Sequence, residues 1–176
     1  MESLKNYIAN SHGELTVTKN GWFYPCWSLT DGVNIYGELS YTGNWKRKGL
    51  IKTAGLNWLI CPKGIFSRTL LVNEQSSGQT VAAITTTPWK GRVTIEFIDG
   101  RIFCLKRQGI FSRINFWQNE QNGDTLTIES KRFSYKQPFI INPGVMQFKN
   151  DAELAILSFA GIYIILRRNE QAAATH

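Results

Sequence analysis

The sequence predicts a mainly β protein, a closed antiparallel barrel of about twelve strands around a buried apolar C-terminal helix. Apolar and polar residues alternate through most of the first 150 residues, as in Val93–Phe97 and Thr125–Glu129, with the period of half-buried strands. Glycine-containing turns separate these runs at the short spacing of a meandering sheet. The long C-terminal segment is apolar on every side, so another element must enclose it.

Several turns carry a glycine where a tight hairpin needs a positive φ. Asp31-Gly32 and Asp99-Gly100 have the composition of two-residue hairpin loops, and Asn20-Gly21 and Asn122-Gly123 give the same signal. Counting the runs between such turns gives about eleven or twelve short strands. The sequence shows no linker long enough to divide them.

The C-terminal segment Leu154–Leu166 is expected to form the central helix, over residues 151–166. Asn150 is placed to cap its first turn with Glu153 three residues later, and Arg167-Arg168 complements the dipole at the far end. The β-branched residues after Gly161 leave a strand open as the alternative for the second half. A membrane span is disfavoured, because 13 apolar residues cover only about 20 Å of a hydrocarbon core of about 30 Å.

Length and composition predict one globular domain. The 176 residues divide into an N-terminal extension (1–13), a single barrel domain (14–168) and a polar tail (169–176). Lys and Arg number 20 against 13 Asp and Glu, so the net charge of +7 attracts anionic partners such as nucleic acid or anionic lipid. The alternative is a basic surface that only keeps the protein in solution.

Cysteine usage and the N-terminus predict a cytoplasmic protein. Cys26, Cys61 and Cys104 are odd in number, lie far apart in apolar or aromatic surroundings, and are interpreted as reduced core residues. The first eight residues lack the continuous apolar stretch of a secretory signal.

Signatures of catalysis are missing from the sequence. The two histidines are His12 in a polar stretch and His176 at the end, and no zinc-binding or phosphate-loop motif occurs. A carboxylate-pair hydrolase using Glu38, Glu96 or Glu129 is not favoured by any pattern. We therefore expect no enzyme activity, no cofactor and no metal site.

One basic cluster stands beside an aromatic residue. Trp45, Lys46, Arg47 and Lys48 lie in a glycine-bounded stretch, and this combination suits an anionic bilayer surface. The alternative is a solvated hairpin with Trp45 turned into the core.

The chain also repeats a five-residue motif. Gly-Ile-Phe-Ser-Arg occurs at residues 64–68 and again at 109–113, which indicates two similar β units within one barrel. The equivalent arginines, Arg68 and Arg113, form a candidate paired phosphate site. The alternative is a strand corner used twice, with both phenylalanines inward and both arginines solvated.

The strand count and the order of elements resemble the tubby C-terminal-like superfamily, which includes tubby proteins, phospholipid scramblases and LURP-one-related proteins. The local resemblance lies in Val145–Phe148 followed by Asp151 and Leu154–Leu166, similar to the last strand and central helix of that superfamily. It implies the barrel fold over residues 14–168. Some members bind phosphoinositides and others are implicated in moving lipids, but no stretch here matches the tubby phosphoinositide-binding residues. The polar tail is a departure, and the cysteines form no cluster of the kind that is lipidated in scramblases.

The expected function is a non-enzymatic binding or scaffold domain that binds anionic phospholipid peripherally through a basic face. Its candidate residues are Trp45, Lys46, Arg47, Lys48, Arg68 and Arg113. One alternative is single-stranded nucleic-acid binding, with Trp117, Phe116 and Tyr135 as stacking residues. The other is a scaffold for a protein partner with no lipid site.

Overall fold

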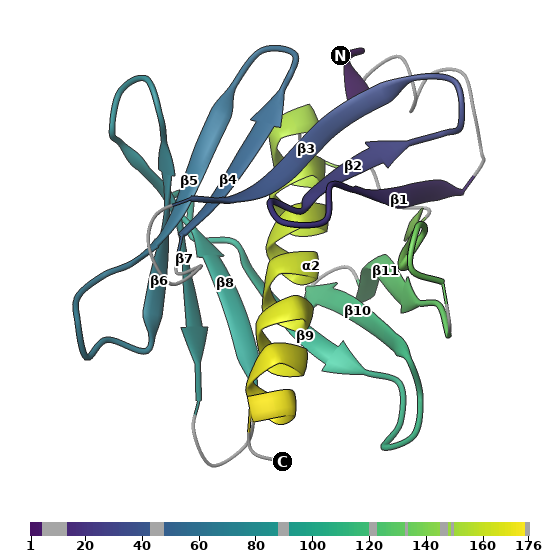
Figure 1. Ribbon diagram of the computed structural model, residues 1–176. Coiled ribbons are helices and arrows are strands. Elements are labelled where there is room, and N and C mark those ends of the chain that lie inside the picture. The colour runs from purple at the N-terminus through teal and green to yellow at the C-terminus, as the bar shows by residue number, and fades with distance from the viewer. Residues whose placement is uncertain are drawn as a thin grey trace.

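A computed structural model describes residues 1–4, 14–42, 48–87, 92–119, 123–132, 134–144, 148 and 150–174. It is a closed antiparallel barrel of twelve strands around one C-terminal helix, as the sequence predicted (Figure 1). The strands are β1 (Leu15–Asn20), β2 (Cys26–Thr30), β3 (Ile35–Thr42), β4 (Lys48–Thr53), β5 (Asn57–Pro62), β6 (Thr69–Glu74), β7 (Thr80–Thr86), β8 (Val93–Phe97), β9 (Ile102–Arg107), β10 (Ile114–Asn119), β11 (Gly123–Ser130) and β12 (Phe139–Pro143). The helix is α2 (Asp151–Ala174).

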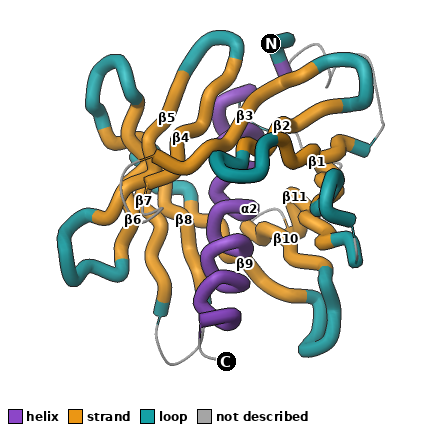
Figure 2. The backbone as a smooth tube through the Cα atoms, viewed as in Figure 1, coloured by secondary structure: helices purple, strands orange, loops and turns teal. Residues whose placement is uncertain are grey.

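The strand order fixes which turns share an end of the barrel. Every strand pairs antiparallel with its neighbours in sequence, and β1 pairs with β12 to close the barrel, for example through Leu15 opposite Ile141. The turns that follow the odd-numbered strands therefore lie at one end, and those that follow the even-numbered strands lie at the other. Helix α2 begins near the β8–β9 turn, and its C-terminal half passes the β9–β10 turn (Figures 1 and 2). The helix therefore leaves the barrel at the end that carries the turns after the odd-numbered strands. We call this end the exit rim.

The core lies between the inner face of the strands and α2. The buried residues of β1, Leu15 and Val17, alternate with half-buried ones, which is the pattern that the sequence predicted for the wall. On the helix all residues from Glu153 to Ile165 are buried, including the predicted core residue Phe159. A helix that is apolar all round is thus enclosed on every side.

Glycines allow the helix to approach the wall. A Cβ on Gly37 would lie 2.8 Å from the ring of Phe159, and one on Gly49 would lie 2.8 Å from the ring of Tyr163. On the helix itself, a Cβ on Gly161 would meet the Cδ1 atom of Ile128 at 2.2 Å. The two aromatic rings therefore occupy the space that a side chain on the wall would fill.

The start of α2 is confirmed and its predicted end is wrong. The Asn150 side chain accepts a hydrogen bond of 2.9 Å from the backbone N–H of Glu153. The helix does not end at Leu166 but runs to Ala174, because the residues after Arg168 (Asn-Glu-Gln-Ala-Ala-Ala) include good helix formers and no breaker. The predicted polar tail is therefore largely the exposed end of the helix. The strand alternative for the second half is also wrong.

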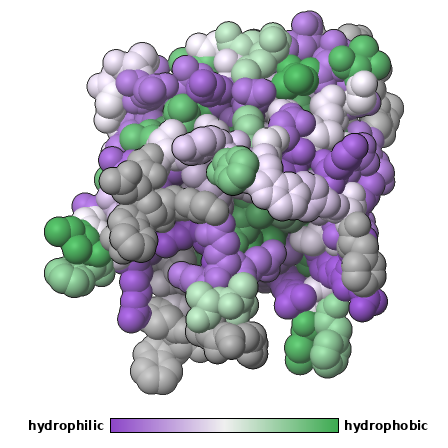
Figure 3. All heavy atoms as spheres, in the orientation of Figure 1, coloured by the Kyte–Doolittle hydropathy of each residue, from purple (hydrophilic) through white to green (hydrophobic). Residues whose placement is uncertain are grey.

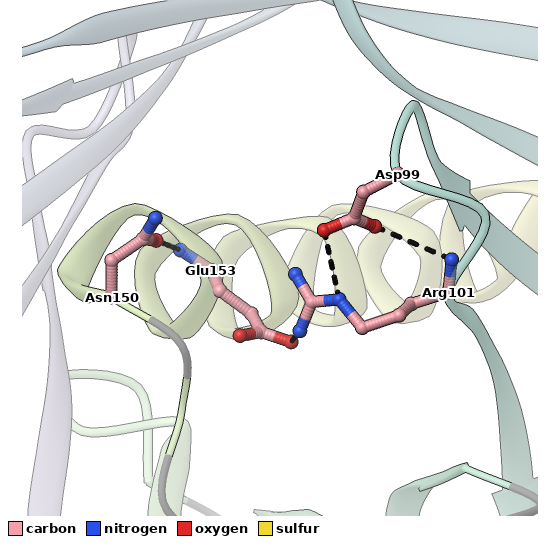
Figure 4. A network of polar contacts seen from close by, with 4 residues as sticks. All are labelled: Asp99, Arg101, Asn150 and Glu153. Atoms are coloured by element: carbon pink, nitrogen blue, oxygen red, sulfur yellow. Dashed lines mark hydrogen bonds and ion pairs between the residues drawn. The ribbon is translucent and has the colours of Figure 1, made fainter.

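Figure 4 shows an ionic contact at the start of α2 that the sequence did not reveal. The guanidinium of Arg101, in the β8–β9 turn, donates hydrogen bonds to the buried carboxylate of Glu153 and to Asp99, the latter at 3.0 Å. These bonds raise the pKa of Arg101, the contact with Glu153 being the larger cause. The contact ties the first turn of the helix to the barrel wall.

Two turns predicted as two-residue hairpins are longer than expected. Asp31-Gly32 and Asp99-Gly100 each lie in a four-residue connection, and both glycines have positive φ values of 96° and 82°. The Asp31 carboxylate accepts backbone N–H bonds from Val33 and Asn34 and a bond from the Tyr36 hydroxyl. A side chain that bonds the backbone in this way stabilises a longer loop.

The predicted core placement of the cysteines holds for one of the three. Cys104 is buried, whereas Cys26 and Cys61 are half-buried, and all three are free. Burial raises the pKa of the Cys26 thiol, and the charge of Glu38 raises it further. Among the described residues, no helix is long and apolar enough to span a membrane.

Candidate functional site

The repeated motif forms two equivalent turns at the exit rim. The β5–β6 and β9–β10 turns each place an isoleucine and a phenylalanine in solvent, with exposures of 86% for Ile65, 97% for Phe66, 84% for Ile110 and 95% for Phe111. The expectation that both phenylalanines point inward is therefore wrong. The reason is the turn itself, because its two central residues project beyond the strand ends whatever their side chains are.

Matching hydrogen bonds hold the two turns in the same shape. In the first, Ser67 N–H donates to the Gly64 carbonyl at 3.1 Å, and the Ser67 hydroxyl accepts from Thr69 N–H at 3.1 Å. In the second, Ser112 N–H donates to the Gly109 carbonyl at 3.1 Å, and its hydroxyl accepts from Ile114 N–H at 3.1 Å. The glycine and serine of the motif thus build the turn, and the Ile-Phe pair is displayed by it.

A third group of exposed aromatic residues lies in the β1–β2 turn of the same rim. Trp22, Phe23 and Tyr24 are all exposed. The ring of Trp22 contacts Tyr135, in the β11–β12 turn, with 5.5 Å between centroids. The Nζ atom of Lys19 lies over the ring of Tyr135, 4.0 Å from its centroid. Aromatic and cationic groups are therefore interleaved at the rim.

Figure 3 shows hydrophobic side chains on several parts of the surface, among them projections at two turns of the exit rim. Hydrophobic side chains protrude at the β5–β6 turn on the left and at the β9–β10 turn at the lower right, and hydrophilic residues lie between them. We call Ile65, Phe66, Ile110 and Phe111 the tip residues. Exposed apolar groups surrounded by polar ones are typical of an interaction surface.

Charge is divided between the two ends of the barrel. Most of the described lysines and arginines lie in the turns and strand ends of the exit rim or on the emerging helix. They are Lys19, Lys48, Lys63, Arg68, Arg92, Lys106, Arg107, Arg113, Lys131, Arg132, Lys136, Arg167 and Arg168. The turns and segments at the opposite end carry carboxylates. They are Glu2, Glu14, Asp31, Glu74, Asp99, Asp151 and Glu153, with Lys52 and Arg101 as the cations at that end, while Glu170 lies on the emerging helix. The molecule is therefore an electrostatic dipole along the barrel.

Two cavities open at the exit rim on different sides of α2. One, of about 310 Å³, is lined by Arg107, Arg113, Lys131 and Arg168 among others, and the second, of about 340 Å³, includes Arg68. Arg168 lines both cavities. The two arginines of the repeat thus share the rim and a helical neighbour, but they do not form one paired site.

The remaining predicted site residues are divided between described and undescribed parts of the chain. Lys48 begins β4 at the exit rim and is exposed. Trp45, Lys46 and Arg47 lie outside the described residues. The same holds for both histidines.

Several rim residues were missed by the sequence interpretation. Arg167 and Arg168 were assigned to the end of the helix, although they lie two turns before its end. Arg107 shares the inward face of β9 with Phe103 and Leu105, so the alternation of that strand was the signal for a charged group at the mouth of the barrel.

The residues considered for nucleic-acid stacking, carboxylate-pair hydrolysis and metal binding do not come together in one site. Of the three proposed stacking residues, Trp117 is fully buried, which excludes it from contact with a nucleic-acid base, Phe116 is half-buried on β10, and Tyr135 is exposed in the β11–β12 turn. Glu38, Glu96 and Glu129 lie on β3, β8 and β11, which are not neighbours in the barrel. Within the described ranges, no three His, Cys, Asp or Glu side chains come together as a metal site.

Comparison of the chain with protein-family models, curated proteins and solved structures gives no match. The candidate site therefore rests on the geometry of the chain itself.

Proposed function

We propose that the protein is a non-catalytic, peripheral membrane-binding domain that docks its exit rim on an anionic phospholipid bilayer. The observation that carries the proposal is the pair of equivalent turns that expose Ile65-Phe66 and Ile110-Phe111 at the end of the barrel where basic residues gather. A cytoplasmic location on the inner membrane surface fits this function.

The tip residues supply the apolar part of the interaction. Full burial of a phenylalanine side chain stabilises a bound state by about 1.5–3 kcal/mol. Trp22 and Tyr24 in the β1–β2 turn are of the residue types that occupy the headgroup region of bilayers. Apolar groups on three turns of one rim suit a broad surface into which each turn inserts separately.

The basic residues supply attraction and orientation. A lysine or arginine near an anionic bilayer contributes about 1 kcal/mol to binding. Carboxylates such as Asp31 and Glu74 gather at the opposite end, so a negative surface attracts the exit rim and repels the other end. The charge distribution thus orients the protein so that the tip residues face the bilayer before they insert.

A protein partner and single-stranded nucleic acid are the competing ligands. Of the predicted stacking residues, Trp117 is buried and excluded from base contact, whereas Tyr135 is exposed at the exit rim, so nucleic-acid binding is tested directly beside vesicle binding. A protein partner would need a matched hollow for each exposed turn, whereas a bilayer accommodates all of them without such complementarity. The resemblance to the tubby C-terminal-like superfamily stays a prediction, because it rests on strand order and helix position.

Cosedimentation of the full chain with vesicles tests the proposal. We expect binding to vesicles of phosphatidylcholine containing phosphatidylserine and little binding to phosphatidylcholine alone. Binding falls as salt is raised, because the screening length shrinks from about 8 Å at physiological ionic strength to about 3 Å at 1 M. A gel-shift assay with single-stranded RNA is run beside it. Failure to bind the anionic vesicles at low salt, whether or not RNA binds, overturns the proposal.

A further inference from the structure

A polar cavity of about 310 Å³ opens at the exit rim between the C-terminal half of α2 and strands β9 to β11. Its volume is at the lower end of the range for small-ligand sites. The residues that line it are Arg107, Arg113, Asn115, Ser130, Lys131, Ile165, Arg168 and Asn169. We call this cavity the rim pocket.

Part of the rim pocket is built from wall positions that elsewhere belong to the apolar core. Arg107 follows Phe103 and Leu105 on the inner face of β9, and Asn115 pairs with Arg107 and precedes the buried Trp117 on the inner face of β10. The Arg107 side chain donates a hydrogen bond to the carbonyl of Ser112, which anchors it at the mouth. Asn115 is buried beside the core, whereas Arg107 is exposed, so the wall here changes from apolar core to a solvent-accessible basic mouth.

The pocket gathers positive charge. Arg168 is half-buried, and this desolvation lowers the pKa of its guanidinium, which the positive charge of Arg107 lowers further. The described residues that line the pocket include three arginines and a lysine but no carboxylate. A bound anion would therefore relieve the repulsion between Arg107 and Arg168.

We propose that the rim pocket binds a phosphate monoester, with Arg107, Arg113, Lys131 and Arg168 as its cationic ligands. A phosphate monoester carries a charge of about −1.5 to −2 at neutral pH and has three terminal oxygens that accept hydrogen bonds. Guanidinium groups match these oxygens in pairs, and the amide of Asn115 and hydroxyl of Ser130 add neutral donors. Inorganic phosphate and the headgroup of a lipid with a terminal phosphate share this chemistry. Delivery by a lipid rests on the proposed docking of the exit rim.

Two measurements on the full chain separate these sources. Calorimetric titration with inorganic phosphate reports the pocket without a membrane. Cosedimentation compares vesicles containing phosphatidic acid, a monoester, with vesicles containing the same fraction of phosphatidylglycerol, a diester. The pocket variant is Arg113→Gln/Lys131→Gln. The matched control, Lys63→Gln/Lys136→Gln, removes the same two charges from the same rim outside the pocket.

We expect the wild type to bind phosphate and to prefer phosphatidic acid over phosphatidylglycerol. The pocket variant is expected to lose about tenfold or more in phosphate affinity and to lose the preference, and the control to keep both. Circular dichroism establishes that both variants are folded. Equal loss in the two variants, or no phosphate binding by the wild type, overturns the pocket. Vesicle binding without a preference for phosphatidic acid overturns the claim that the pocket binds a lipid with a terminal phosphate, but it leaves the docking proposal standing. Phosphate binding without vesicle binding overturns docking but supports the pocket.

Discussion

The indole N–H of Trp117, on β10, donates a hydrogen bond of 2.8 Å to the backbone carbonyl of Leu157, on α2. Both residues are buried, so the bond joins the barrel wall to the N-terminal third of the helix within the core. A buried side-chain contact of this kind fixes the position of the helix along the barrel.

Trp117→Phe is expected to destabilise the protein by about 2–4 kcal/mol. The substitution removes a hydrogen bond worth about 1 kcal/mol and leaves a cavity beside the helix. Chemical denaturation measures the loss. Trp22→Phe, at an exposed rim position, is the control and changes stability by less than about 0.5 kcal/mol. A loss of equal size in the two variants would exclude the wall-to-helix contact as its cause.

Gly161→Ala is expected to destabilise the protein, although the same change in an exposed helix stabilises it by about 1 kcal/mol. The new Cβ would lie 2.2 Å from the Cδ1 atom of Ile128, so the expected cost is about 1–3 kcal/mol. Ile128→Val removes that methyl group. In a double-mutant cycle the two substitutions together should cost less than the sum of the single changes. Simple additivity would contradict the close approach.

Arg101→Met is expected to cost about 3 kcal/mol, because it leaves the carboxylate of Glu153, with a side-chain exposure of 4%, without its guanidinium. The double variant Arg101→Met/Glu153→Met should be more stable than the single variant, since no buried charge remains. Asp99→Asn removes the half-exposed partner and is expected to cost under about 1 kcal/mol. Urea denaturation of the three variants tests this order.

The Asp31 turn gives a pH-dependent contribution to stability. Hydrogen bonds from the Asn34 backbone, the largest cause, and from the Tyr36 hydroxyl lower the pKa of Asp31 from 3.8 to about 2. Because this pKa is lower in the folded state, the stabilisation is present above pH 4 and disappears as pH falls through 2. Solvent screening of the exposed carboxylate limits it to about 1 kcal/mol. The difference in unfolding free energy between wild type and Asp31→Asn should therefore vanish near pH 2. If this difference in unfolding free energy were the same at pH 6 and pH 2, the Asp31 carboxylate would not be the source of the stabilisation.

The fold was largely predictable from the sequence because each wall strand buries one face and alternates accordingly. The apolar run from Leu154 predicted that the strands close into a barrel, since a helix that is apolar on every side needs an enclosing wall. The end of α2 was missed because Arg167-Arg168 has the composition of a last turn. The residues after it form helix equally well, and no local pattern marks where an exposed helix stops.

The candidate site was predictable only in part. The repeat pointed to Arg68 and Arg113, and both lie at the exit rim. The placement of Phe66 was wrong because a hydrophobic residue was assumed to be buried, whereas the turn places it in solvent. The contribution of Arg168 depends on the tertiary fold, which brings the helix beside Arg113 and Arg107, 55 and 61 positions earlier in the chain.

The most direct test of rim docking is vesicle cosedimentation of Phe66→Ser/Phe111→Ser beside Val33→Ser/Ile98→Ser, all four positions being exposed. The first pair removes tip residues from the exit rim, and the second removes apolar side chains from turns at the opposite end. Docking by the tips predicts that the first variant binds anionic vesicles about a hundredfold more weakly, since two inserted phenylalanines stabilise the bound state by about 3 kcal/mol or more. The second variant should bind like the wild type. Undiminished binding by Phe66→Ser/Phe111→Ser, or an equal loss in both variants, would contradict docking through the exit rim.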